Sequence, residues 1–84
     1  MESKMNIGDA VRSRIVELCG ERKITINKLS TICGLTQSTL NNIMHRKGSS
    51  PSVSTVKKIC DGLEISMAQF FTSSIFDDLE QEIK

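Results

Sequence analysis

Apolar residues recur at intervals of three and four along most of the chain, which is the spacing of one helix face. Between residues 25 and 44 this pattern occurs twice, once on each side of Gly34. The apolar positions are Leu29, Ile32 and Cys33 before the glycine and Leu40, Ile43 and Met44 after it. The pattern predicts two short helices joined by a tight turn.

Capping residues mark the ends of these two helices. Thr25 and Thr36 stand where an N-cap hydroxyl is favoured, and Gly34 can adopt a positive φ without a Cβ penalty. Two capped helices around a glycine turn form a helix-turn-helix. The second helix has uncharged hydrogen-bonding residues away from its apolar stripe, namely Gln37, Ser38, Asn41 and Asn42.

The remainder of the chain predicts further helices. Asn6 can cap a first helix that runs to about residue 22, and its apolar stripe is Val11, Ile15, Leu18 and Cys19. A loop from Arg46 to Pro51 precedes a fourth helix, which has either Ser52 or Ser54 as its cap and the stripe Val56, Ile59, Cys60 and Leu63. A fifth helix starts at Ser66, where Gln69 completes a capping box. We therefore expect an all-α domain over residues 1–72.

Residues 73–84 differ in composition and are expected to form an acidic amphipathic tail. The apolar residues Ile75, Phe76, Leu79 and Ile83 recur at helical spacing behind Ser73 or Ser74, which predicts a sixth helix. Its apolar edge can either fold back on the core or meet another subunit, and the sequence does not discriminate between these two arrangements.

Charge is distributed unevenly although the net charge is only +1. Residues 1–63 carry ten Lys or Arg against five acids, whereas residues 64–84 carry one Lys against five acids. No acid occurs from Arg22 to Cys60, a stretch with seven positive charges. A basic patch is the electrostatic footprint of phosphate binding, so this stretch favours a nucleic-acid partner.

Other chemistry is not indicated by the sequence. The three cysteines form no C-x-x-C pair and fall at apolar helix positions, which predicts reduced, buried thiols, and His45 is the only histidine. We therefore expect no catalytic residues, metal, cofactor or small-molecule ligand. The chain has neither an apolar run of about 20 residues nor a signal-peptide pattern, so a cytoplasmic protein without a membrane partner is expected.

The stretch from Ile24 to Phe71 resembles the helix-turn-helix domain of the phage-repressor, Cro and Xre family. Three segments carry the resemblance at matching separations: ITINKLSTICGLTQSTLNNI, SPSVSTVKKI and LEISMAQFF. The resemblance implies a five-helix, lambda-repressor-like domain that binds operator DNA as a two-fold dimer. It also implies that the helix from Gln37 to His45 enters the major groove.

The resemblance assigns candidate DNA contacts residue by residue. Gln37, Ser38 and Asn42 match the base-reading positions, with Asn41 beside them, and Gln and Asn can pair bidentately with adenine. The positions expected to contact phosphate are Thr36, Arg46, Lys47, Ser49 and Ser50. Ile26 replaces a glutamine that commonly contacts phosphate in the family, and Asn27 and Lys28 are the expected substitutes.

Two other positions depart together from the family pattern. The family often pairs an arginine late in the first helix with a glutamate at the end of the third, and the matching positions here are Cys19 and Met44. We interpret this change as the replacement of an ion pair by packing. Gly62 and Glu64 also depart from the usual pattern after the fourth helix.

These observations favour a sequence-specific double-stranded DNA-binding transcriptional regulator, a repressor acting as a homodimer. The alternative is an antitoxin-like or other interaction module that docks a protein partner through the C-terminal tail. An enzyme is the least favoured class.

Overall fold

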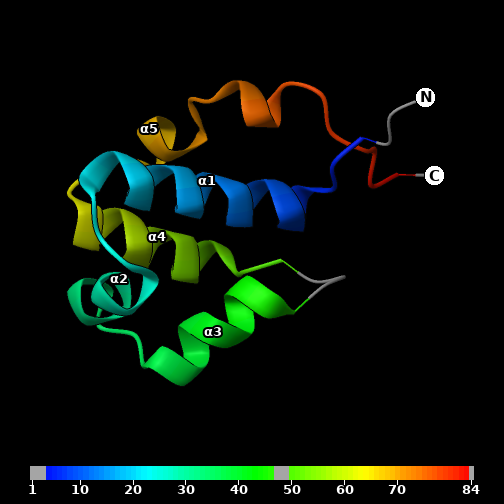
Figure 1. Ribbon diagram of the computed structural model, residues 1–84. Helices are drawn as coiled ribbons and strands as arrows, with labels where there is room; N and C mark the ends of the chain where they lie inside the picture. Colours follow the sequence, from blue (N-terminus) through cyan, green and yellow to red (C-terminus); the bar gives the residue numbers. More distant parts are fainter. Residues whose placement is uncertain (1–3, 47–49, 84) are drawn as a thin grey trace.

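Five α-helices and one short 3₁₀ helix make up the computed structural model, which describes residues 4–46 and 50–83 (Figure 1). The helices are α1 (Ile7–Arg22), α2 (Ile26–Cys33), α3 (Gln37–His45), α4 (Val53–Leu63), α5 (Met67–Phe71) and the 3₁₀ helix η1 (Ser74–Phe76). This architecture confirms the predicted all-helical, five-helix fold.

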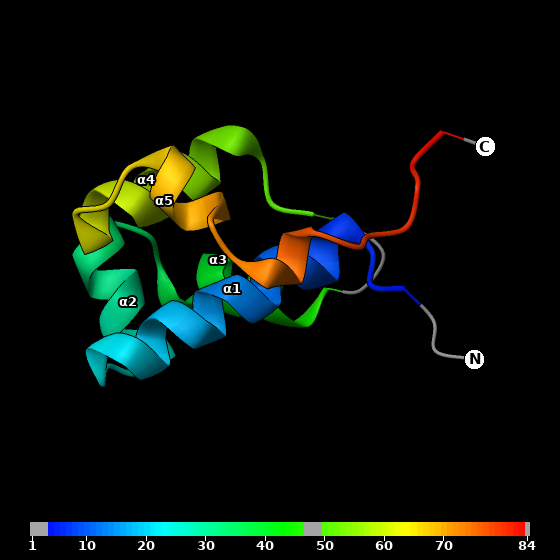
Figure 2. The same cartoon turned by 90° about the horizontal axis from the view of Figure 1, so that it is seen from above.

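The helices are stacked so that α3 lies at one side of the molecule. In Figure 1, α1 and α4 run across the centre, α5 and η1 lie above α1, and α2 and α3 lie below α4. The two ends of the described chain both lie at the end of the molecule opposite α2 (Figure 2). The helix-turn-helix therefore has one side against the rest of the fold and the other side open.

Each of the five α-helices contributes to a single apolar core. Ile15 from α1, Leu29 from α2, Leu40 from α3 and Phe70 from α5 are fully buried, as is Ile59 from α4. The predicted stripes on α1 and α4 are buried throughout. On α2, however, Ile32 is 40% exposed, so that of the three residues in the predicted stripe only Leu29 and Cys33 face the core.

Side-chain N-caps begin each α-helix as the sequence predicted. The side chains of Asn6, Thr25, Thr36 and Ser66 each accept a hydrogen bond from a backbone N–H in the first turn, and Ser66 and Gln69 form the expected capping box. For α4 the sequence left two choices, and Ser52 rather than Ser54 is the cap. These bonds satisfy helix N–H groups that have no partner within the helix.

The C-terminal segment forms η1 and then leaves the helical conformation, so the predicted sixth α-helix is wrong. The backbone N–H of Glu80 donates to the carbonyl oxygen of Met5 at 3.0 Å, and Leu79 forms a parallel β-bridge with Met5. An extended backbone is needed for this pairing. A helix would also place Glu80 and Glu82 near its C-terminus, where the helix dipole disfavours negative charge.

The tail folds back on the core over η1. The Phe76 ring lies 4.9 Å from the Phe71 ring and 6.3 Å from the Phe70 ring, measured between centroids. Ile75 and Leu79 are half-buried, whereas Ile83 is 86% exposed. Of the four apolar tail residues, only Ile83 therefore remains largely in solvent.

Candidate nucleic-acid interface

The outward face of α3 consists of uncharged polar side chains. Leu40 turns into the core and Ile43 and Met44 pack against it, which fixes the orientation of the helix. The four residues predicted to read bases are all exposed on the remaining faces: Gln37, Ser38, Asn41 and Asn42. The structure thus brings these four side chains together on one helix and presents them to solvent.

These four side chains have unused hydrogen-bonding capacity. Within residues 4–46 and 50–83, none of them makes a hydrogen bond or an ion pair. Thr36 at the start of the helix is different, because its hydroxyl accepts from the Thr39 backbone N–H at 3.1 Å and donates to the Thr39 hydroxyl at 2.8 Å. The face of α3 can therefore donate and accept hydrogen bonds without breaking any within the protein.

The candidate phosphate-binding residues lie at both ends of the helix-turn-helix. Asn27 and Lys28 are exposed in the first turn of α2, whereas Ile26 is half-buried and packed against the core. At the far end of α3, Arg46 and Ser50 are exposed. Lys47 and Ser49, which were predicted to contact phosphate, lie outside the described residues.

A hollow of about 220 Å³ lies beside the C-terminal half of α3. Its lining includes Asn42, Arg46 and Ser50, together with Arg12 from α1. Asn42, which was predicted to read bases, therefore lies close to Arg46 and Ser50, which were predicted to contact phosphate.

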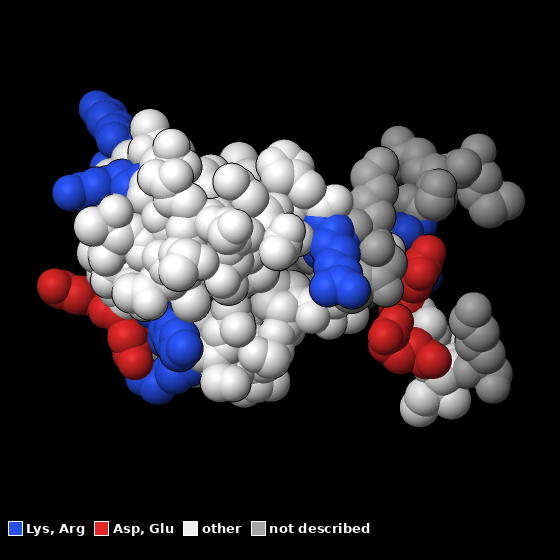
Figure 3. Space-filling view, turned by 90° about the horizontal axis from the view of Figure 1, so that it is seen from below, with Lys and Arg blue, Asp and Glu red and all other residues white. Residues whose placement is uncertain are grey.

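Charge surrounds the α3 face rather than covering it. Figure 3, which views the molecule from the side of α2 and α3, shows an uncharged centre with Lys and Arg around it and acids confined to the edges. Lys23, Lys28 and Arg46 are exposed, whereas Lys57 forms an ion pair with Asp61. The acid-free stretch thus supplies fewer uncompensated cations than the sequence count indicated.

Two arginines that the sequence count treated as ordinary surface charges are buried. Arg12 and Arg14 are each 8% exposed, and they pair with Asp9 and Glu17 respectively. The i,i+3 spacing of each pair is visible in the sequence, but burial is not. These pairs reduce the positive charge that the amino-terminal part of the chain can offer to phosphate.

The two positions that depart from the family's ion pair both take part in apolar packing. Cys19 is 4% exposed in the core, and Met44 is half-buried against it. Arg12 instead supplies the polar contact to the end of α3: its Nη1 donates to the carbonyl oxygens of Arg46 at 3.1 Å and Ile43 at 3.4 Å. Sequence reasoning missed this contact.

The cysteines have the environment of unreactive thiols. Burial raises the pKa of Cys19 and of Cys60, and burial together with the neighbouring Cys19 and Cys60 raises the pKa of Cys33 to about 11. Over the described part of the chain, no group of three His, Cys, Asp or Glu side chains is placed to hold a metal ion. None of the described helices is long and apolar enough to cross a membrane.

Comparison with known proteins found a matching family model and a similar solved structure. Residues 14–73 match the family model of the Cro/C1-type HTH DNA-binding domain. The chain is similar to the crystal structure of the prophage Lp1 protein 11, with 33% sequence identity and a TM-score of 0.74 over 82% of this chain and 91% of that one. No curated protein matches the chain.

Proposed function

The chain belongs to the Cro/C1-type helix-turn-helix DNA-binding family, and from this premise we propose that it is a sequence-specific transcriptional repressor that binds operator DNA as a homodimer. In this proposal α3 enters the major groove of double-stranded DNA, and the protein acts in the cytoplasm. The observation that carries it is the exposed set Gln37, Ser38, Asn41 and Asn42, whose side chains have no partner among the described residues.

The chemistry of this set supports reading of bases. Gln37 and Asn42 can each pair bidentately with adenine N6 and N7, and Ser38 can donate or accept. The cations Lys28 and Arg46 lie on either side of the α3 face and are suited to neighbouring phosphates. In a two-fold dimer, the two copies of α3 would lie about 34 Å apart, one turn of DNA.

Selection of bound duplexes from a random pool tests this function. We expect a recovered motif with dyad symmetry, and we expect Gln37→Ala or Asn42→Ala to weaken binding to it by about tenfold or more, because each removes a base contact. Gln81→Ala, an exposed change in the tail, is the matched control and should leave affinity unchanged. Recovery of no motif, with binding to DNA equally indifferent to Gln37→Ala and Asn42→Ala, would contradict the proposal.

The second candidate function, an interaction module that docks a protein partner through the tail, rests on the exposure of Ile83 beside Glu80 and Glu82. It has less support, because Phe76 packs on Phe70 and Phe71 within the same chain. Purification from the native host separates the two candidates. A stoichiometric partner that is lost in Ile83→Asp would favour the interaction module over the repressor.

A further inference from the structure

The five α-helices end in two different ways. Left-handed residues close α1, α2 and α4, where the backbone N–H groups of Lys23, Gly34 and Glu64 take up carbonyls of the last turn. The C-cap residues of α3 and α5, Arg46 and Thr72, have negative φ angles of −87° and −84°, and each backbone N–H reaches a single carbonyl. More of the final carbonyls of α3 and α5 therefore need other donors.

Buried arginines from α1 supply these donors. Arg12 donates to the carbonyl oxygens of Ile43 and Arg46 at the end of α3, and its other terminal nitrogen contacts Asp9 at 2.6 Å. Cations are favoured at helix C-termini, because the final carbonyls carry the negative end of the helix dipole. Arg12 thus acts as a side-chain cap on α3.

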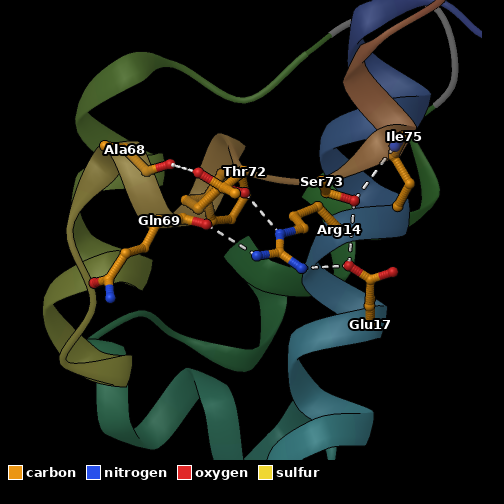
Figure 4. Close-up of polar contacts among 8 residues, drawn as sticks. Arg14, Glu17, Ala68, Gln69, Thr72, Ser73 and Ile75 are labelled. Atoms are coloured by element: carbon orange, nitrogen blue, oxygen red, sulfur yellow. Dashed lines mark hydrogen bonds and ion pairs between the residues drawn. The ribbon is translucent and has the colours of Figure 1, made fainter.

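Arg14 does the same for α5. Its Nε donates to the carbonyl oxygen of Phe70 at 2.6 Å and its Nη2 to that of Gln69 at 2.9 Å, while Glu17 holds the guanidinium from within α1 (Figure 4). Arg12 and Arg14 are equally buried, each has a carboxylate three residues away, and each caps one helix. They differ in which helix they cap, and only one of them caps the helix proposed to read DNA.

We propose that Arg12 is a positioning residue for DNA recognition, which closes the end of α3 and thereby fixes Asn42 and Arg46 against the DNA. This inference rests on the proposed function of α3. The Arg46 backbone N–H donates to the Asn42 carbonyl at 2.9 Å, so the base-reading asparagine and the phosphate-binding arginine share the turn that Arg12 closes. Both residues also line the hollow beside α3 together with Arg12.

The affinity for DNA depends on whether the last turn of α3 is ordered in the free protein. If that turn frays in the free protein, only the fraction with an intact α3 is competent to bind, and apparent affinity falls by the same fraction. Arg12 does not need to contact DNA for this effect. Its guanidinium is occupied by Asp9 and by the carbonyls of α3.

The test compares Arg12→Met with Arg14→Met in the full chain, at a temperature where circular dichroism shows both variants to be folded. We expect Arg12→Met to weaken binding to the selected duplex about tenfold relative to Arg14→Met. Amide hydrogen exchange should accelerate at Arg46 in Arg12→Met and at Thr72 in Arg14→Met, since these N–H groups close the two affected turns. If Arg12→Met does not fold, Asp9→Ala and its counterpart Glu17→Ala provide the same comparison.

The outcomes separate this inference from the proposed function. If the wild-type protein selects no duplex, the proposed function fails, while hydrogen exchange still reports whether Arg12 closes α3. If a motif is selected and the two arginine variants bind it equally well, the positioning role is overturned. If the slope of log affinity against log salt decreased in Arg12→Met by about one phosphate contact, the positioning role would also be overturned. Arg12 would then contact DNA directly.

Discussion

At the scale of single residues, the structure places two long side chains in a backbone conformation that glycine prefers. Lys23 and Glu64 close α1 and α4 with φ angles of 56° and 58°, whereas Gly34 closes α2 with a φ of 71°. A residue with a Cβ pays about 1–2 kcal/mol for the left-handed region. The fold therefore carries avoidable strain at two helix ends.

Replacing Glu64 with glycine should relieve this strain. We expect Glu64→Gly to raise the free energy of unfolding by about 1 kcal/mol, because glycine adopts the C-cap conformation without a steric cost. Urea denaturation followed by circular dichroism measures the change. Gly34→Ala is the matched control and should lower stability by a similar amount; a stabilising effect there would show that the conformation costs nothing.

At the scale of elements, α2 packs closely against α4 because Gly62 has no side chain. A Cβ at this position would lie 2.9 Å from the Cys33 Sγ, 3.1 Å from the Cys33 Cα and 3.1 Å from the Ile32 carbonyl carbon. The last two atoms belong to the α2 backbone and cannot rotate away. The position of the helix-turn-helix on the rest of the domain thus depends on one glycine of α4.

Adding a methyl group at this contact should separate the two helices. We expect Gly62→Ala to destabilise the fold by about 1–2 kcal/mol, since overpacking outweighs the gain in helix propensity. Gly20→Ala in α1 is the control, because a Cβ there meets no atom within 4 Å, and it should stabilise by about 0.5–1 kcal/mol. Thermal unfolding of both variants makes the comparison; equal shifts would argue against a close α2–α4 contact.

Local pattern predicted most of these elements, and long-range contacts account for the remainder. The N-caps at Thr25 and Thr36 and the inward stripe around Leu40 depend on residues within about one helical turn, so the sequence revealed them. Arg12 contacts Arg46, a partner 34 residues away, and no local pattern indicates that pair. The tail was wrongly predicted as a helix for the same reason. Its extended backbone pairs with Met5 near the other end of the chain, and no local pattern reveals this contact.

At the scale of the whole molecule, the distribution of exposed charge determines which side of the protein attracts DNA. Arg12, Arg14 and Lys57 are engaged in ion pairs, whereas Lys28 and Arg46 are exposed near α3. The acidic tail runs past the amino-terminal end of α1 (Figure 1), and its acids lie at the edge of the face in Figure 3. The net charge of +1 therefore understates the positive potential on the side of α3.

Binding should weaken steeply with salt, and the exposed cations should account for this dependence. We expect Lys28→Gln to weaken binding similarly for all duplexes and to lower the slope of log affinity against log salt by about one contact. Lys4→Gln serves as the control, since Lys4 pairs with Asp78 in the tail at 3.2 Å. Fluorescence anisotropy over a salt series gives the slope for each variant. The same slope for Lys28→Gln and wild type would show that Lys28 does not contact DNA.

The protonated thiols have a practical consequence for mapping the protein on DNA. With a pKa of about 11, Cys33 is ionised in only about one molecule in a thousand at pH 8, and the thiolate is the form that attacks alkylating reagents. A cysteine introduced on an exposed surface, as in Gln81→Cys, would therefore react far faster than the native ones. A cleavage probe attached there would report the orientation of the bound protein without prior removal of Cys19, Cys33 or Cys60.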